Sequence, residues 1–150
     1  NRSILADPRS NEMKDLVNTK IKFREPFRPF APSALAEIAE SYFELPNATD
    51  NMAARFMLLV TNVHEDKQDL IPAVSHMGTA RVQTVYKETN SSYYNLIERF
   101  GQSTAVPILL NTSFNVRGEP IVSSPNDALN TFRNSGIDTL VIGNHIVDKP

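Results

Sequence analysis

The sequence contains no cysteine, and its three histidines are scattered along 150 residues. Without cysteine the chain has neither disulfide bonds nor thiolate metal ligands, which is typical of proteins from a reducing compartment. The scattered histidines leave no ligand set for a structural zinc site. No run of about 18 apolar residues is present, and no charged, apolar and small-residue leader opens the chain. We therefore predict a cytoplasmic protein without a membrane-spanning segment.

A large excess of charge of one sign is also missing. Fifteen Lys and Arg stand against seventeen Asp and Glu, so the formal net charge is -2. This balance makes nucleic acid and anionic membranes unlikely partners on global electrostatics alone. A hydrophobic content of 41% and a length of 150 residues favour one globular domain with its own core. Because the chain begins at Asn1 without an initiator Met, we expect a segment of a longer or processed polypeptide.

Apolar periodicity predicts a mixture of helices and strands. The predicted helices lie at residues 11–18, 34–44, 92–101 and 125–135. Ser10 or Asn11 would cap the first, Ser33 the second and Ser124 the fourth, and Ser91 or Ser92 would start the third. The predicted strands lie at residues 56–60, 79–86, 106–110 and 137–143. These elements together indicate an α/β fold of the mixed α+β type, a sheet with helices packed on it.

Polar side chains follow the short apolar run from Val106 to Leu110. They include Asn111, Ser113, Asn115 and Arg117. In open α/β sheets ligands bind in the crevice beyond the carboxyl ends of strands, where such side chains supply donors and acceptors. Arg117 can fork onto a phosphate or a carboxylate. The stretch therefore predicts a ligand site, and a plain polar loop after a core strand is the alternative.

A second informative stretch runs from Lys20 to Ser33. In an extended chain, Lys20, Lys22 and Arg24 would share one face, opposite two apolar side chains. The prolines at 26, 29 and 32 keep the backbone extended, while Phe27 and Phe30 would anchor it. This pattern predicts one packed face and one anion-binding face. The alternatives are a solvated edge strand, or a basic and aromatic surface that stacks nucleic-acid bases.

Alternation along residues 79–86 places Arg81 and Gln83 on one face of the predicted strand. An inward-facing arginine needs an anionic partner, because a buried unpaired charge costs several kcal/mol. That partner is either a ligand phosphate or an internal carboxylate. His76 precedes a glycine turn, where a hydrogen-bonded structural histidine is the alternative to a catalytic one.

Four stretches in this order resemble a known family: NRSILADPR at 1–9, KFREPFRPFAPS at 22–33, GTARVQTV at 78–85 and PILLNTSFNVRGEPIV at 107–122. Together they resemble the C-terminal domain of the NodU/CmcH/TobZ-type O-carbamoyltransferases. The resemblance implies a YrdC/Sua5-like fold, a twisted mixed sheet with packed helices and a concave nucleotide site. It also implies that residues 10–150 form this domain and that residues 1–9 are the hinge from a preceding Kae1-like domain.

The resemblance further implies a division of labour. The YrdC-like domain would convert carbamoyl phosphate and ATP, with Mg²⁺, into carbamoyl-adenylate. The Kae1-like domain, which carries the family's metal site, would pass the carbamoyl group to a hydroxyl of a sugar or another small metabolite. No metal ligands are therefore expected in this chain itself.

Site residues follow from the resemblance and from the predicted faces. Lys22 and Arg24 would hold phosphates, Arg81 the carbamoyl or phosphate oxygens, and Asn111 and Ser113 the carbamoyl group or the nucleotide. Of these, Arg81, Ser113 and Lys22 form the predicted catalytic set. Further candidates are Arg28, His76, Gln83, Asn115 and Arg117.

The sequence departs from the family at one place. The family commonly has an acidic residue before the glycine of a His-x-Asp-Gly-Thr/Ser-Ala-Arg stretch, whereas His76, Met77 and Gly78 run one residue shorter here. Two other functions are compatible with the sequence. One is a nucleotide-binding or regulatory module without turnover, and the other is an RNA-binding domain of YrdC-like fold.

Overall fold

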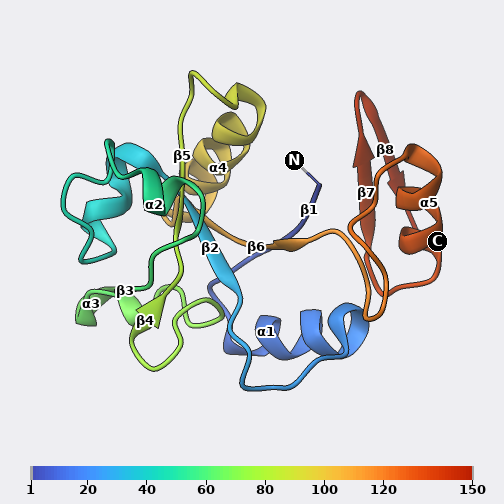
Figure 1. Cartoon of the computed structure of the whole chain (residues 1–150), viewed down its shortest axis with the longest axis horizontal. Helices are drawn as coiled ribbons and strands as arrows, with labels where there is room; N and C mark the ends of the chain where they lie inside the picture. The colour runs from blue at the N-terminus through green and yellow to red at the C-terminus, as the bar shows by residue number, and fades with distance from the viewer. Residues whose placement is uncertain (1, 150) are drawn as a thin grey trace.

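A computed structural model describes residues 2–149, and Asn1, the first residue of the predicted hinge, lies outside them. Its central sheet has the strand order β1-β6-β2-β5 (Figure 1). The strands are β1 (Ser3–Ala6), β6 (Ile108–Ser113), β2 (Ala31–Leu35) and β5 (Gln83–Val85). Strand β6 runs antiparallel to β1 and β2, and β5 runs parallel to β2. The sheet is therefore mixed, as predicted.

Two small sheets lie outside the central one. The first pairs β3 (Thr61–Asn62) with β4 (Thr79–Ala80), and the second pairs β7 (Thr139–Ile142) with β8 (His145–Asp148). The helices are α1 (Asn11–Val17), α2 (Met52–Arg55), α3 (Glu65–Gln68), α4 (Ser91–Thr104) and α5 (Pro125–Arg133). Helices and strands of these kinds confirm the α+β class. The likeness to the YrdC fold stays a prediction. No helix within residues 2–149 has the length and hydrophobicity needed to cross a bilayer.

Local capping chemistry sets the starts of α1 and α5 as the sequence predicts. The Ser10 side chain accepts a hydrogen bond from the Glu12 amide at the start of α1. At α5, Ser124 and Asp127 form a reciprocal capping box, with Pro125 in the first turn. Each contact satisfies a helix amide that would otherwise lack a partner.

The two faces of the central sheet pack against different elements. One face, with Ile108 and Leu110 of β6, belongs to the main hydrophobic core. The other face packs Leu109 and Val85 against Ile97 of α4, and we call it the α4 face. Figure 1 shows α4 beside β5 and the start of β6. The split follows from strand geometry, since successive side chains point to opposite faces.

Helix α4 is longer than the sequence predicts. It continues past Gly101 to Thr104 and ends at Ala105, which has a left-handed φ of 61°. The glycine is needed for packing instead of termination, because a Cβ at position 101 would lie 2.5 Å from the Pro107 Cβ. A side chain there would therefore clash with the start of the chain that leads into β6.

The predicted buried strand at residues 56–60 is wrong. Phe56, Leu58 and Val60 are 60%, 78% and 61% exposed, and no strand forms there. The segment follows the end of α2 at Arg55 and turns at Met57, whose φ is 57°. An apolar run shows that a segment is hydrophobic, but it does not show that a neighbouring strand is available to pair with it.

The predicted helix at residues 34–44 is also wrong in its first part. Ser33 lies in the middle of β2 and pairs with both β5 and β6, so it caps no helix. A 3-10 helix then spans Ala36–Ser41. The predicted burial of Ala39, Tyr42 and Phe43 is confirmed. Strand pairing on both sides of β2 outweighs the helical periodicity of this stretch.

Three predicted strands change their extent or their partners. The strand at 79–86 is split into β4 and β5, with Arg81 and Val82 between them. The strand at 106–110 becomes β6 and continues to Ser113, so the polar residues Asn111 and Ser113 lie inside the strand. The strand at 137–143 forms as β7, but it pairs with β8 and lies outside the central sheet.

Candidate functional site

Five cationic side chains line two cavities of about 210 and 410 Å³ that share Arg24 and Arg28. The smaller cavity adds Lys22 and Arg117, and the larger adds Arg81. We call this paired space the cationic hollow. It collects cations from three separate stretches of the chain, and its lining includes Lys22, Arg24 and Arg81, which were predicted to bind phosphate or carbamoyl oxygens.

The backbone reaches the hollow differently from the prediction. Residues Asn18–Lys22 form a π-helical turn that continues α1, so the predicted extended strand is wrong. Phe23 has a left-handed φ of 48°, and Lys20 is exposed beside Gly136, away from the hollow. The Asn18 side chain holds the reversal, because it donates to the Arg24 carbonyl at 2.6 Å and accepts from the Arg24 amide at 3.0 Å.

Lys22 lies almost buried at the floor of the hollow. Its Nζ donates to the Ser113 carbonyl at 2.7 Å and hydroxyl at 3.1 Å, and to the Asn115 carbonyl at 3.0 Å and Oδ1 at 2.8 Å. Burial lowers the pKa of Lys22 to about 8, and the nearby charge of Arg24 adds to the effect. Lys22 thus joins the turn after α1 to the end of β6 through neutral oxygen atoms.

Arg24 has donor capacity that the protein does not use. Its guanidinium stacks 4.3 Å from the centre of the Phe30 ring, and Nη2 donates to the Pro29 carbonyl at 3.3 Å. The Nε atom is buried and has no hydrogen-bond partner within residues 2–149. Burial lowers the pKa of Arg24, as do the charges of Arg28 and Arg81. Phe30 is buried as predicted, whereas the predicted anchor Phe27 is 69% exposed.

Arg81 does not face inward to an internal carboxylate. It is exposed between β4 and β5, and it makes no ion pair with any residue of the described chain. The predicted burial of Arg81 is therefore wrong, because the strand breaks at this residue. The side chain lines the larger cavity with its charge available for an external anion.

The other two arginines are partly engaged. Arg28 pairs with Glu25 at 2.8 Å, and both side chains are well exposed. Arg117 donates to the Phe23 carbonyl at 3.0 Å. An exposed ion pair of this kind contributes little stability. Glu25 therefore reduces the positive charge of the hollow without closing it.

Ser33, Gln83 and Asn111 form a closed hydrogen-bonded triangle across three strands of the α4 face. The Ser33 hydroxyl donates to Gln83 Oε1 at 2.8 Å, and Asn111 Nδ2 donates to Ser33 Oγ and Gln83 Oε1, both at 2.9 Å. Neither Gln83 nor Asn111 is among the residues that line the hollow. The structure therefore places these two predicted site residues beside it, while Ser113 and Asn115 lie in its lining.

His76 lines the larger cavity, but its backbone serves a tight turn. Its amide donates to the Thr79 carbonyl at 2.8 Å, and the Thr79 amide donates back at 3.0 Å. Gly78 has a φ of 75° within this turn. No group of three or more His, Asp or Glu suited to a metal ion occurs within residues 2–149. The hollow thus offers no carboxylate set that fits Mg²⁺ by itself.

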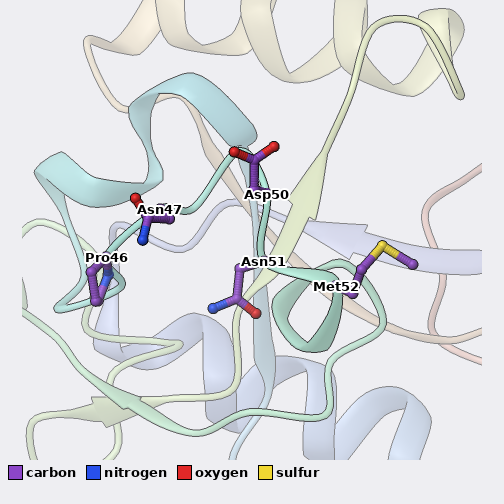
Figure 2. A pocket seen from close by; sticks show the side chains of 5 residues that line it. All are labelled: Pro46, Asn47, Asp50, Asn51 and Met52. Atoms are coloured by element: carbon purple, nitrogen blue, oxygen red, sulfur yellow. The ribbon is translucent and has the colours of Figure 1, made fainter.

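A larger depression of about 640 Å³ lies on the loop before α2 (Figure 2). Asp50 is the one charged residue among its lining, and the Asn51 side chain caps α2 by accepting from the Ala54 amide. Figure 2 shows that the labelled side chains come from the loop at 46–51 and from Met52 at the start of α2, and that they point in different directions. The cationic hollow is therefore the better candidate site, because it has five cationic side chains in its lining, although this depression is larger.

The family model that matches this chain describes carbamoyltransferases, and the similar proteins include nodulation proteins. A family model described as "Carbamoyltransferase C-terminus" matches residues 1–149. Nodulation protein NolO of Bradyrhizobium diazoefficiens is 51% identical over 150 residues, which cover 99% of this chain and 27% of the relative. Nodulation protein NolNO of Sinorhizobium fredii is 49% identical over 150 residues, which cover 99% of this chain and 22% of the relative.

A third relative, nodulation protein U of Rhizobium tropici, is 39% identical over 118 residues. That match covers 78% of this chain and 20% of the relative. The chain thus spans 20% to 27% of the length of these curated relatives. Because a model of the family covers nearly every residue, the chain belongs to the carbamoyltransferase C-terminus family.

Proposed function

We propose that the cationic hollow binds carbamoyl phosphate and ATP and that this domain forms carbamoyl-adenylate for transfer to a hydroxyl group. One observation carries the proposal. Cations from three separate stretches line one hollow, and within the described residues Glu25 on Arg28 is the one acidic side chain that pairs with them. Membership of the carbamoyltransferase C-terminus family supports the carbamoyl-transfer part of the proposal.

The proposed reaction balances with one water molecule. Water cleaves carbamoyl phosphate to carbamate and phosphate, and a carbamate oxygen then attacks the α-phosphorus of ATP. The bond between the α-phosphorus and the bridging oxygen breaks, and pyrophosphate leaves. Such a transfer asks the protein for positioning and for neutralisation of phosphate charge more than for covalent catalysis. Fixed guanidinium groups supply both.

The roles of the side chains follow from their positions. Arg24 and Arg81 have unused donors and would hold the phosphates and stabilise the charge on the leaving pyrophosphate. Arg28 lines both cavities and Arg117 lines the smaller one, and both would add charge. Ser113 would orient the carbamoyl group from the floor.

Three further residues complete the proposed site. Lys22 and Asn115 hold the floor on which the small donor would lie. Asn111, which is held by Ser33 and Gln83, would hydrogen-bond to the carbamoyl group or to the nucleotide. Mg²⁺ would enter with the ATP phosphates, because the hollow has no carboxylate set of its own.

The rest of the proposed pathway lies outside these residues. We propose that a Kae1-like domain of a longer chain holds the acceptor, a sugar or other small metabolite, and that the enzyme works in the cytoplasm as a biosynthetic O-carbamoyltransferase. The small share of each relative that this chain covers agrees with a further catalytic domain.

Pyrophosphate release tests the proposal. The chain incubated with ATP, Mg²⁺ and carbamoyl phosphate should release pyrophosphate, and Arg81→Ala should abolish the release. Arg99→Ala is the matched control, because Arg99 is an exposed arginine on α4 away from the hollow. The longer chain is assayed in parallel, since the isolated domain lacks its acceptor partner.

Two results would contradict the proposal. The first is ATP binding that is indifferent to carbamoyl phosphate, with no pyrophosphate from either chain, which indicates a nucleotide-binding module without turnover. The second is RNA binding that weakens steeply with salt and that depends on Lys22, with no affinity for free ATP.

A further inference from the structure

A separate cavity of about 250 Å³ lies at the edge of the central sheet, between β5, the end of α2 and the start of α4. Aromatic and amide side chains form most of its lining, unlike that of the cationic hollow. The residues that matter here are Arg55, Phe56, Gln83, Tyr86 and Tyr93. We call this space the edge cavity.

One wall of the edge cavity offers flat surfaces. The Arg55 guanidinium lies 4.9 Å from the centre of the Tyr86 ring and 5.9 Å from that of Phe56. Arg55 forms no ion pair within residues 2–149. Phe56 is 60% exposed, although it is among the largest apolar side chains of the protein. A planar ring placed on this wall would cover Phe56 and meet both aromatic and guanidinium surfaces.

The edge cavity has an unused hydrogen-bond donor in its lining. Gln83 Oε1 accepts two of the three bonds of the triangle, whereas Gln83 Nε2 makes no hydrogen bond within the described chain. The Tyr93 hydroxyl is buried next to Ser33; burial raises the pKa of Tyr93 to about 12, and the hydrogen bond with Ser33 opposes that rise. The Gln83 amide therefore supplies a donor in a cavity with an aromatic wall.

Two connections through the chain link residues of the edge cavity to residues of the cationic hollow. Gln83 follows Arg81 of the hollow by two residues, so the two Cα atoms are at most about 7 Å apart. Gln83 also bonds to Asn111, which precedes Ser113 of the hollow by two residues on β6. The edge cavity and the hollow share no lining residue, but these separations are within the length of one ligand with a planar end and an anionic end.

We propose that the edge cavity binds the purine base of the nucleotide whose phosphates lie in the cationic hollow. The base stacks on Phe56 beside Arg55, and Gln83 Nε2 donates to a ring nitrogen. This inference rests on the proposed function for the phosphate end of the ligand. Nothing in the comparisons assigns a role to Phe56, Arg55 or Tyr93.

The test compares ATP with inorganic tripolyphosphate by isothermal titration, because the second ligand lacks the base. The wild-type chain should bind ATP more tightly than tripolyphosphate. Phe56→Ala should weaken ATP binding about tenfold and leave tripolyphosphate binding unchanged, given the usual contribution of stacking on an aromatic side chain. Leu58→Ala is the matched control, since Leu58 is exposed on the same segment and does not line the edge cavity.

The outcomes separate this inference from the proposed function. Equal affinity for ATP and tripolyphosphate in the wild type overturns the base site and leaves the cationic hollow standing. The same holds if Phe56→Ala and Leu58→Ala bind ATP equally well. If the wild type binds neither ligand, the proposed function fails, and the base site fails with it.

Discussion

Strand β6 serves two regions of the α4 face that differ in chemistry. Leu109 packs under α4 with Ile97, whereas Asn111 and Ser113, two and four residues later on the same face, lie in the triangle and in the hollow. Helix α4 thus covers one end of the face and leaves the other end to polar groups. The comparison teaches that one strand can stabilise the fold with its first half and present a site with its second.

The largest expected effect falls on the apolar region. Ile97 is fully buried under α4, so Ile97→Ala should lower the free energy of unfolding by about 2–5 kcal/mol. Urea denaturation followed by circular dichroism measures this loss. The protein that remains folded should bind tripolyphosphate with unchanged affinity, and a large loss of affinity would show that the two regions are not separable.

A smaller loss of stability is expected at the helix packing contact. Gly101→Ala places a Cβ 2.5 Å from the Pro107 Cβ, so it should lower the free energy of unfolding by about 1–3 kcal/mol. Gly118→Ala provides a comparison at a glycine with a φ of 84° and no atom within 4 Å of its added Cβ. If the steric account is right, Gly101→Ala should lower the midpoint of thermal denaturation less in a Pro107→Gly background, which lacks the clashing Cβ, than in the wild type.

The polar region should respond in the opposite way. Arg24→Ala removes the stacking on Phe30 and the bond to the Pro29 carbonyl together with a buried Nε that lacks a partner in the described chain, so these effects on stability partly offset each other. Tripolyphosphate affinity should fall about tenfold or more. Arg24→Lys should recover only part of the affinity, because lysine lacks the planar fork. Titration calorimetry with a parallel thermal melt distinguishes this from a folding defect, which would lower both quantities.

The smallest expected effect is a pH dependence at Lys22. Its folded-state pKa of about 8 lies below the ordinary value of 10.5, so the unfolded chain binds more protons between these values. Stability should therefore rise with pH from about 8 to 10.5. The stability difference between wild type and Lys22→Met, measured by denaturation across this range, isolates the contribution. A difference that stays constant with pH would contradict the buried-lysine account.

The sequence predicts the parts of the fold that depend on local chemistry. Ser10 and Ser124 cap the helices that they are expected to cap, because a cap uses residues within one turn. Residues 56–60 and Ser33 are misplaced in the prediction, because their structure depends on whether distant strands pair with them. Apolar composition alone carries no information on that pairing.

The candidate site shows the same division. Lys22, Arg24 and Arg81 line the two cavities of the hollow, although the strand that was to align Lys22 and Arg24 does not form, and their roles stay a prediction. The chain reverses at Phe23 because the Asn18 side chain makes two hydrogen bonds to the Arg24 backbone. The pattern of charged residues in the sequence does not predict these two bonds. The sequence does not predict the edge cavity. Its lining residues come from α2, β5 and α4, which are far apart in the chain, so no single stretch shows the pattern.

The most direct test of the cationic hollow is the affinity for carbamoyl phosphate itself. Isothermal titration should show binding to the wild type, equal binding to Arg99→Ala, and at least about tenfold weaker binding to Arg81→Ala, because a charge-assisted contact is lost. Equal affinity in all three proteins would contradict the account, since Arg81 would then line the hollow without holding an anion in it.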